Sequence, residues 1–468
     1  MKRFLVLCIS LILAVSIPAA VGCNKKDQTK NRLIEITVAD GDTDLWTALR
    51  DDFNEASDGE FTAEISVAQN PESVLEYSFN NGNAPDLVLL PTGRGVGFTE
   101  DLIRSRAIVN LDELLDRNVY GEETKLRDKF LSGFLSTGAT NPYQSELSPE
   151  TSSYMLPVFF EPYGLFYNKE LMTADGAAEG TFKLPDAWDG YLNLRPSVTA
   201  KNAGAEDSDK LYMYGYISAQ DNEAIIAPTV ASYGGLTLAE RMLNYDYIYE
   251  NTDFASALTT FGEINSLLST GETESGLGNY VLSENAAQAL VDEKLMFLAG
   301  GADVMEQLKV LENFDFSKIG FTAAFAANDS SQRYAMTDME QIFIPQQAEN
   351  REGAEEFLLY LYSDRAAEIM LKEGGRVLPT KYALENAGGY VDKGLMLLIN
   401  VFADGSVHPC FGQEAVIDAD VLATLEASWS TVYANGFTSS VLLGRNTQVW
   451  TDNLKHDSVI LRSALLGN

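Results

Sequence analysis

The chain has 468 residues, enough for two to four domains of ordinary size, and this length excludes a peptide hormone or a small disulfide-stapled scaffold. Hydrophobic residues make up 46% of the chain and charged residues 22%, as in average globular proteins. Lysine and arginine number 33 against 68 acidic residues, for a net charge of -35. Such an acidic surface repels phosphate backbones, so we expect no nucleic-acid partner.

The N-terminus has the order of an export signal. Lys2 and Arg3 precede a short apolar run, residues 4–17, and small residues follow up to Gly22. The run is too short for a membrane-spanning helix, which needs about 20 residues. Cys23 then precedes a polar stretch, and the segment resembles a bacterial lipobox, although Ala20 stands where leucine is usual. We expect a signal peptide over 1–22 and a lipidated tether over 23–32, with lipid on Cys23; the alternative is an ordinary secretory signal.

Cysteine usage leaves one thiol in the body of the chain. With Cys8 removed and Cys23 acylated, Cys410 has no partner, so no internal disulfide is expected. We interpret Cys410 as a small buried hydrophobe rather than a nucleophile.

From residue 33 the pattern alternates strands and helices. Residues 33–39 are β-branched and apolar, and a turn at 41–44 precedes Leu45, Ala48, Leu49 and Phe53 at helical spacing. Residues 61–67 predict a second strand.

The next helix begins after a cap at Asn70 and Pro71, with Val74, Leu75 and Phe79 facing inward, and ends at residues 80–83. The apolar run 86–90 predicts a buried parallel strand. This βαβαβ order indicates a doubly wound sheet, which binds ligands beyond the carboxyl ends of its strands.

The rest of the chain is less regular. Residues 168–333 mix helices with tyrosine-rich connections at 212–216 and 245–249. Residues 352–362 predict an amphipathic helix, and Gly374 and Gly375 end the next helix. The last 90 residues have a largely helical pattern.

Enzyme signatures are sparse. The histidines are His408 and His456, no G-x-S-x-G or phosphate-binding loop occurs, and residues 93–98 lack the third glycine of a dinucleotide fingerprint. We expect no catalytic residue, no metal and no cofactor. Paired carboxylates of a glycoside hydrolase stay open, because many acidic pairs exist.

Several segments together resemble the solute-binding lipoproteins of bacterial ABC importers, specifically the carbohydrate group (family 1) that includes maltose-binding protein. They are residues 82–88, 156–158, 164–169, 184–189, 354–357, 374 and 378–380, in family order over most of the chain. The resemblance implies an α/β, two-lobed periplasmic-binding-protein-like fold (type II) with hinge-connected doubly wound lobes. It places crossovers near 160–164, 335–338 and 379–383. The expected N-lobe is 33–162 plus 336–380, and the expected C-lobe is 163–335 plus 381–468.

The resemblance also implies ligand-binding residues. Glu161, a single charge in an apolar run, matches a sugar-contacting position, and its alternative is a solvated strand end. Asp42 is a helix cap, a hydroxyl acceptor, or both. Arg94, in the glycine-rich loop, matches a cleft arginine or is an exposed loop residue. Gln220 and Asn222 match a segment that faces the sugar.

One departure concerns the stacking platform. Residues 299–303 occupy the place where many relatives have Gly-Trp, and no tryptophan stands there. An aromatic ring supplies apolar area to a sugar face, so Tyr163, Tyr233 or Phe411 is expected to replace it, and Asp303 is a further candidate contact.

The leading hypothesis is therefore an exported protein that captures a carbohydrate, with an oligosaccharide favoured, and delivers it to ABC transporter permease subunits. It would be lipid-anchored to the outer face of the bacterial cytoplasmic membrane or lie in the periplasm. The alternatives are an exported glycoside hydrolase and a solute-binding protein for a non-sugar ligand.

Overall fold

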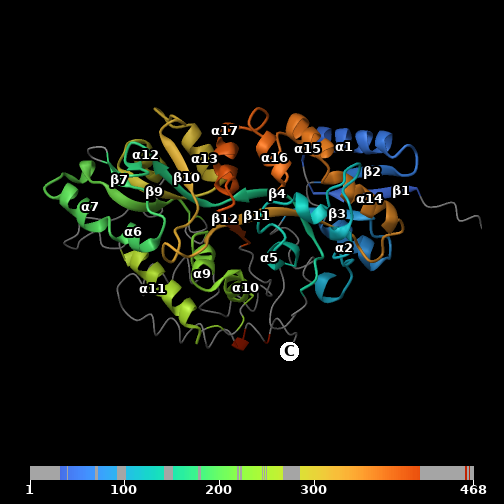
Figure 1. Ribbon diagram of the computed structural model, residues 1–468, viewed down its shortest axis with the longest axis horizontal. Helices are drawn as coiled ribbons and strands as arrows, with labels where there is room; N and C mark the ends of the chain where they lie inside the picture. The colour runs from blue at the N-terminus through green and yellow to red at the C-terminus, as the bar shows by residue number, and fades with distance from the viewer. Residues whose placement is uncertain are drawn as a thin grey trace, which may run out of the picture. The chain divides into compact units, whose positions relative to one another are not determined.

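The computed structural model describes residues 32–39, 41–68, 72–91, 102–141, 151–177, 181–218, 221, 224–244, 246, 248, 250–266, 285–411, 459–460 and 463. Two main β-sheets organise these residues, and helices and a large hydrophobic cluster pack with each of them (Figure 1). A short pair, β6 (Met172–Thr173) with β7 (Phe182–Lys183), stands apart from both sheets.

The larger sheet has six strands in the order β12-β11-β3-β1-β2, and β4 pairs with β11 outside that path. Its strands are β1 (Leu33–Val38), β2 (Thr62–Val67), β3 (Leu87–Pro91), β4 (Leu156–Pro162), β11 (Arg333–Phe343) and β12 (Val407–Cys410). Strand β1 is parallel to β2 and β3, whereas β11 is antiparallel to β3 and β4. The sheet is therefore mixed, with a parallel βαβαβ unit at one end.

The second sheet has four strands in the order β10-β5-β9-β8. They are β5 (Gly164–Asn168), β8 (Tyr212–Tyr216), β9 (Leu295–Gly300) and β10 (Ile319–Thr322). Strand β5 follows β4 after the single residue Tyr163, so the chain passes from one sheet to the other at this residue.

Helices cover both sheets. The larger sheet is accompanied by α1 (Thr43–Ala56), α2 (Glu72–Asn80), α4 (Leu126–Lys129), α5 (Thr137–Thr140), α14 (Arg351–Leu361), α15 (Asp364–Ile369), the short π-helical segment η3 (Met370–Gly374) and α16 (Lys381–Asn386). The smaller sheet is accompanied by α6 (Trp188–Leu192), α7 (Arg195–Asn202), α9 (Ile226–Gly234), α10 (Leu236–Leu243), α11 (Thr252–Ser266), α12 (Asn285–Val291) and α13 (Ala302–Lys309). Helix α17 (Lys393–Ile399) contacts β4 as well as α13 and β10, so it lies against both halves.

Most of the predicted elements of the first 90 residues are confirmed. The strands at 33–39, 61–67 and 86–90 form β1, β2 and β3, and their parallel pairing confirms the βαβαβ unit. The amphipathic helix at 352–362 is α14, and Gly375 ends the following helical segment with a left-handed φ of 58°. The predicted cap at Asn70 and Pro71, the loop at 93–98 and most of the last 57 residues lie outside the described residues.

Two local predictions are wrong. Val74 is 65% exposed, because α2 turns Leu75 and Phe79 toward the core, and a residue directly before Leu75 lies about 100° around the helix. Residues 212–216 are strand β8 rather than a connection. Their alternating aromatic side chains favour a sheet, and Tyr214 and Tyr216 are buried in the core of the smaller half.

Cys410 is a buried, free thiol in a hydrophobic core, which confirms its interpretation as a small hydrophobe. Burial raises the pKa of this thiol far above its ordinary value. None of the helices in the described ranges combines the length and the apolar character that a membrane span requires.

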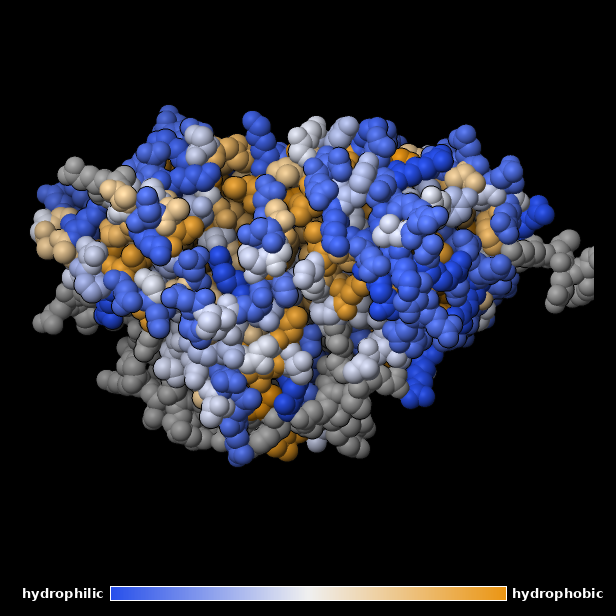
Figure 2. Space-filling view, viewed as in Figure 1, coloured by the Kyte–Doolittle hydropathy of each residue, from blue (hydrophilic) through white to orange (hydrophobic). Residues whose placement is uncertain are grey.

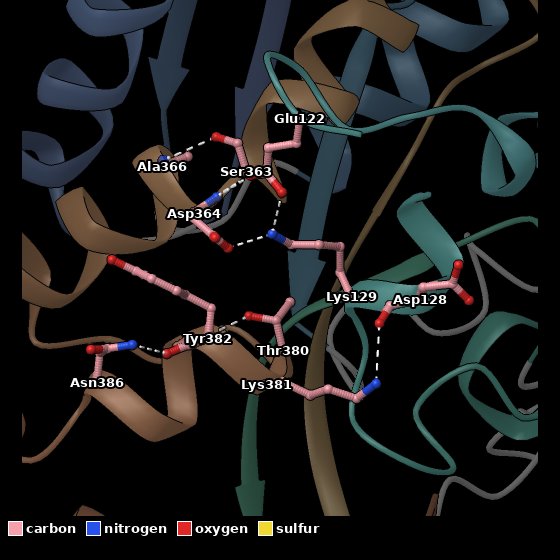
Figure 3. Close-up of polar contacts among 11 residues, drawn as sticks. Glu122, Asp128, Lys129, Ser363, Asp364, Ala366, Thr380, Lys381, Tyr382 and Asn386 are labelled. Carbon is pink, nitrogen blue, oxygen red and sulfur yellow. Dashed lines mark hydrogen bonds and ion pairs between the residues drawn. The ribbon is translucent and has the colours of Figure 1, made fainter. Parts of the chain in front are cut away.

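A buried lysine of α4 is paired with two carboxylates of the larger half, one in a loop and one at the start of α15 (Figure 3). The Lys129 side chain, 7% exposed, donates to Glu122 at 2.6 Å and also forms an ion pair with Asp364 at the start of α15. Beside it, the Lys381 ammonium donates to the carbonyl of Asp128 at 3.3 Å, which ties α16 to α4. The network fixes the start of α15 and α16 against the loop that carries α4.

Candidate functional site

A cavity of about 350 Å³ lies along β4 and β11, close to the passage between the two sheets. It is lined by carboxyl, guanidinium, aromatic and aliphatic side chains, contributed by Phe159, Phe160, Glu161, Asp338, Met339, Glu340, Arg376, Val377, Leu395 and Ile399. Figure 2 shows apolar residues gathered in the region where Figure 1 places α17 and β4, with hydrophilic surface on either side. A volume of this size accommodates a small molecule.

The register of β4 and β11 determines which side chains meet in the cavity. Asp338 is directly opposite Glu161, and Glu340 is directly opposite Phe159. Opposed residues of an antiparallel pair point to the same face, as do residues two apart on one strand. Two carboxylates of β11 therefore share a face with Glu161 and an aromatic ring of β4.

Arg376 covers one part of this face. Its guanidinium lies 3.9 Å from the ring centroid of Phe159 and forms an ion pair with Glu340. A guanidinium over an aromatic face is held by the ring quadrupole, and the carboxylate fixes its plane. The charge of Glu340 is thus balanced within the protein.

Tyr163 stands where the chain leaves β4 for β5. Its backbone amide donates to the Met336 carbonyl at 2.7 Å, and its hydroxyl donates to Asp338 Oδ2 at 3.2 Å. Its ring lies against Gly301, where an added Cβ would come within 2.9 Å of the ring carbons. Burial, and then the carboxylates of Asp338 and Asp303, raise the pKa of Tyr163 far above its ordinary value, so the hydroxyl stays protonated and acts as a donor.

Asp338 has an unusual protonation equilibrium. Burial, the largest cause, and the charges of Glu161 and Asp303 together raise the pKa of this carboxyl to about 6, although the hydrogen bond from Tyr163 opposes the shift. The carboxyl changes its charge near neutral pH.

The structure brings together three of the residues that the sequence predicts. Glu161 is exposed and lines the cavity, Tyr163 lies beside it, and Asp303 is exposed in the first turn of α13. The charges of Glu161 and Asp303 both raise the pKa values of Asp338 and Tyr163, so these four side chains lie close together.

Asp42 caps the adjacent helix. Its Oδ1 accepts from the Leu45 amide at 3.0 Å, as its position before α1 predicts. It also lies beside the segment that carries Arg376, since a Cβ on Gly374 would be 3.3 Å from Asp42 Oδ2. Its predicted hydroxyl contact stays a prediction.

The remaining candidates lie elsewhere. Phe411 is 6% exposed and packs edge-on to Phe134 at a centroid distance of 6.2 Å. The Tyr233 hydroxyl shares a 2.5 Å hydrogen bond with Thr260. The other predicted residues lie outside the described residues: Arg94, Gln220, Asn222 and Cys23.

Sequence reasoning missed Asp338 and Arg376 as site residues. A weak signal existed for both, because Asp338 ends the predicted crossover at 335–338 and Arg376 follows Gly374 and Gly375 near the predicted crossover at 379–383. The pairing of β4 with β11 places Asp338 in the cavity beside Glu161, and the contacts of Arg376 with Phe159 and Glu340 place its side chain there as well.

The chemistry of this cavity suits binding. Carboxylates accept hydrogen bonds from hydroxyl groups, and apolar walls suit the C-H faces of a polyhydroxylated ligand. In the part of the chain that the structure describes, no group of three or more histidine, cysteine or acidic side chains is arranged to hold a metal ion.

Comparisons with known proteins find one matching family model and similar solved structures. A family model described as bacterial extracellular solute-binding protein matches residues 42–368. A search of curated proteins finds no match. Among solved structures, the bacterial solute receptor AcbH, whose structure report describes an exclusive preference for β-D-galactopyranose, is 12% identical with a TM-score of 0.64, covering 94% of this chain and 99% of that chain.

Two further structures have similar scores. The apo form of RafE from Streptococcus pneumoniae is 16% identical with a TM-score of 0.60, covering 92% of this chain and 98% of its own. A cyclo/maltodextrin-binding protein complexed with maltotetraose is 14% identical with a TM-score of 0.60, covering 94% and 98%. At these identities the similarity establishes a shared fold.

Proposed function

Because the chain belongs to the family of bacterial extracellular solute-binding proteins, we propose that it captures a carbohydrate in the cavity beside Glu161 and delivers it to ABC transporter permease subunits. The family and the two-lobed α/β fold expected from the sequence are confirmed. In this proposal the protein acts as a receptor and catalyses no reaction.

One observation carries the carbohydrate proposal. Glu161 lines a cavity that also contains an aromatic ring and a second carboxyl directly across the strand pair. Charge-assisted hydrogen bonds from sugar hydroxyls to carboxylates are roughly twice as strong as neutral ones, and apolar walls shield them from water. The galactopyranose preference and the maltotetraose complex of the structural relatives support the same ligand class.

Calorimetric titration with maltose, maltotetraose and D-galactose tests the proposal. We expect at least one sugar to bind, and Glu161→Gln to lower its affinity about 5- to 150-fold, because the substitution removes the charge-assisted part of the bonds. Glu161→Ala should bind more weakly still, since ligand donors then lose their partner. The matched control is Glu170→Gln, an exposed glutamate after β5, which should leave affinity unchanged.

Two outcomes would contradict the proposal. Wild-type affinity in Glu161→Ala removes Glu161 from the site. Reducing sugar released from oligosaccharides by the purified protein would favour the glycoside hydrolase alternative.

We further propose that sugar binding closes the two lobes about the crossovers. The proposed bounds are 33–162 plus 336–380 and 163–335 plus 381–468, except that α16 and β12 pack with the larger sheet and would move with the first lobe. A ligand shifts this equilibrium only by its differential affinity for the closed state, so the sugar must contact both lobes. The passage at Tyr163 supports the idea, since one residue separates β4 from β5. Small-angle scattering should give a smaller radius of gyration at saturation, and an unchanged radius contradicts closure.

The proposal includes export and a lipid anchor on Cys23. It is supported by the signal-like order of residues 1–22 and the polar tether that follows. In cell fractionation, wild-type protein should partition with membranes and Cys23→Ser should not. A lipidated Cys23→Ser variant would rule out this anchor.

A further inference from the structure

Asp338 occupies a position that the capture of a sugar by Glu161 alone does not explain. It lies on β11, directly opposite Glu161 on β4, and both side chains line the cavity. Like charges placed directly opposite each other on neighbouring strands destabilise a sheet. The cavity nevertheless contains this pair, and the two carboxyl groups provide adjacent hydrogen-bond acceptors.

A hydrogen bond from Tyr163 fixes the orientation of the Asp338 carboxyl group. Among the described residues, the hydroxyl of Tyr163 is the hydrogen-bond donor to this carboxyl, at 3.2 Å from Oδ2. Tyr163 is itself held by its backbone bond to β11 and by the close packing of its ring on Gly301. The hydrogen bond thus engages one carboxyl oxygen from a rigid position.

The charged groups that face Asp338 are of one sign. Glu161 approaches from β4 and Asp303 from α13, and both charges disfavour the ionised form of Asp338. On β11 itself, Glu340 is neutralised by Arg376, and α17 contributes only aliphatic side chains to the cavity. Burial, the largest influence, opposes the ionisation of Asp338, as do the charges of Glu161 and Asp303, whereas the hydrogen bond from Tyr163 favours the carboxylate.

We propose that Asp338 is a second ligand-contacting carboxylate, oriented by Tyr163, and that it accepts a hydrogen bond from a sugar hydroxyl next to the one bound by Glu161. This inference rests on the proposed function and adds a specificity: the ligand presents two neighbouring hydroxyl groups to the paired carboxylates. Capture is then coupled to pH, because protonation of Asp338 removes a charge-assisted acceptor. Affinity falls as the pH drops below about 6, by up to about tenfold per pH unit.

The test is a pH series of calorimetric titrations, from about pH 5 to about pH 8, with whichever of maltose, maltotetraose and D-galactose binds the wild type. Asp338→Asn should lower affinity about 5- to 150-fold at the upper end of the series and should flatten the profile. Asp329→Asn, at an exposed turn between β10 and β11, is the matched control and should keep the wild-type profile.

Two further variants test whether the neighbours of Asp338 control its ionisation or only support the fold. Tyr163→Phe keeps the ring but removes the donor that favours the carboxylate, so the midpoint of the affinity profile should move to higher pH. Glu161→Gln removes a like charge, so its midpoint should move to lower pH in addition to its weaker binding. Opposite shifts from two neighbours are not expected from a general loss of stability.

The outcomes are distinguishable. A wild-type affinity and pH profile in Asp338→Asn, with sugar binding intact, overturns this inference and leaves the proposed function standing. An unmoved midpoint in Tyr163→Phe overturns the positioning role of that hydroxyl. Failure of every sugar to bind the wild-type protein overturns the proposed function, and this inference with it.

Discussion

Replacing Asp338 by asparagine is expected to stabilise the folded protein at neutral pH. Asparagine has nearly the same shape and its carbonyl can still accept the Tyr163 hydrogen bond, but it carries no charge beside Glu161. A carboxylate in a buried, acidic environment lowers the stability of the fold, and a role in binding accounts for its presence there.

The magnitude follows from the protonation equilibrium. The pKa of Asp338 is about 6 in the folded protein and about 3.9 in an unfolded chain. Since the folded state binds the proton more tightly, this group lowers the unfolding free energy as pH rises from about 4, and the loss levels off above about pH 6. A difference of two pKa units corresponds to about 3 kcal/mol, so the stability of Asp338→Asn relative to wild type should rise by about 2 to 3 kcal/mol between acidic and neutral pH.

Urea denaturation of both proteins across this pH range measures the effect. Other titrating groups are common to the two proteins and cancel in the difference of unfolding free energies. Asp329→Asn serves as the control, because its side chain is exposed. A difference between Asp338→Asn and wild type that does not change with pH would refute the electrostatic account of Asp338.

Three other predictions concern the rest of the fold. Lys129→Ala should lower the unfolding free energy by about 2 to 3 kcal/mol, because it leaves the carboxylates of Glu122 and Asp364 without their buried cation (Figure 3). Urea denaturation measures this loss, and wild-type stability of the variant would contradict the role of Lys129. Asp42→Ala should cost about 1 kcal/mol through loss of the cap of α1, measured by thermal unfolding, and an unchanged melting temperature counts against the cap. The Cys410 thiol should resist thiol reagents until the protein unfolds, because burial raises its pKa; rapid labelling of native protein lacking residues 1–23 would show that it is accessible.

Local sequence patterns were sufficient for the elements that depend on nearby residues. The cap at Asp42, the strand at 33–39 and the amphipathic helix at 352–362 follow from spacing within a few residues, and the structure confirms each of them. Helical spacing alone failed for Val74, because a period of 3.6 residues does not specify where the apolar face ends. The family resemblance added Glu161 as a candidate, at a position where a lone charge interrupts an apolar strand.

The composition of the cavity was decided by tertiary structure. Tyr163 and Asp338 are 175 positions apart in the chain, and their contact depends on the register of β4 against β11. A shift of one residue in that register would turn Asp338 to the opposite face of the sheet, and no local pattern encodes the alignment of two distant strands. Arg376 likewise meets Phe159 only because the loop after η3 folds back over β4. Sequence by itself determined the family and most elements of the first 90 residues, because these depend on motif order and local periodicity. The pairing of the carboxylates arises from long-range packing.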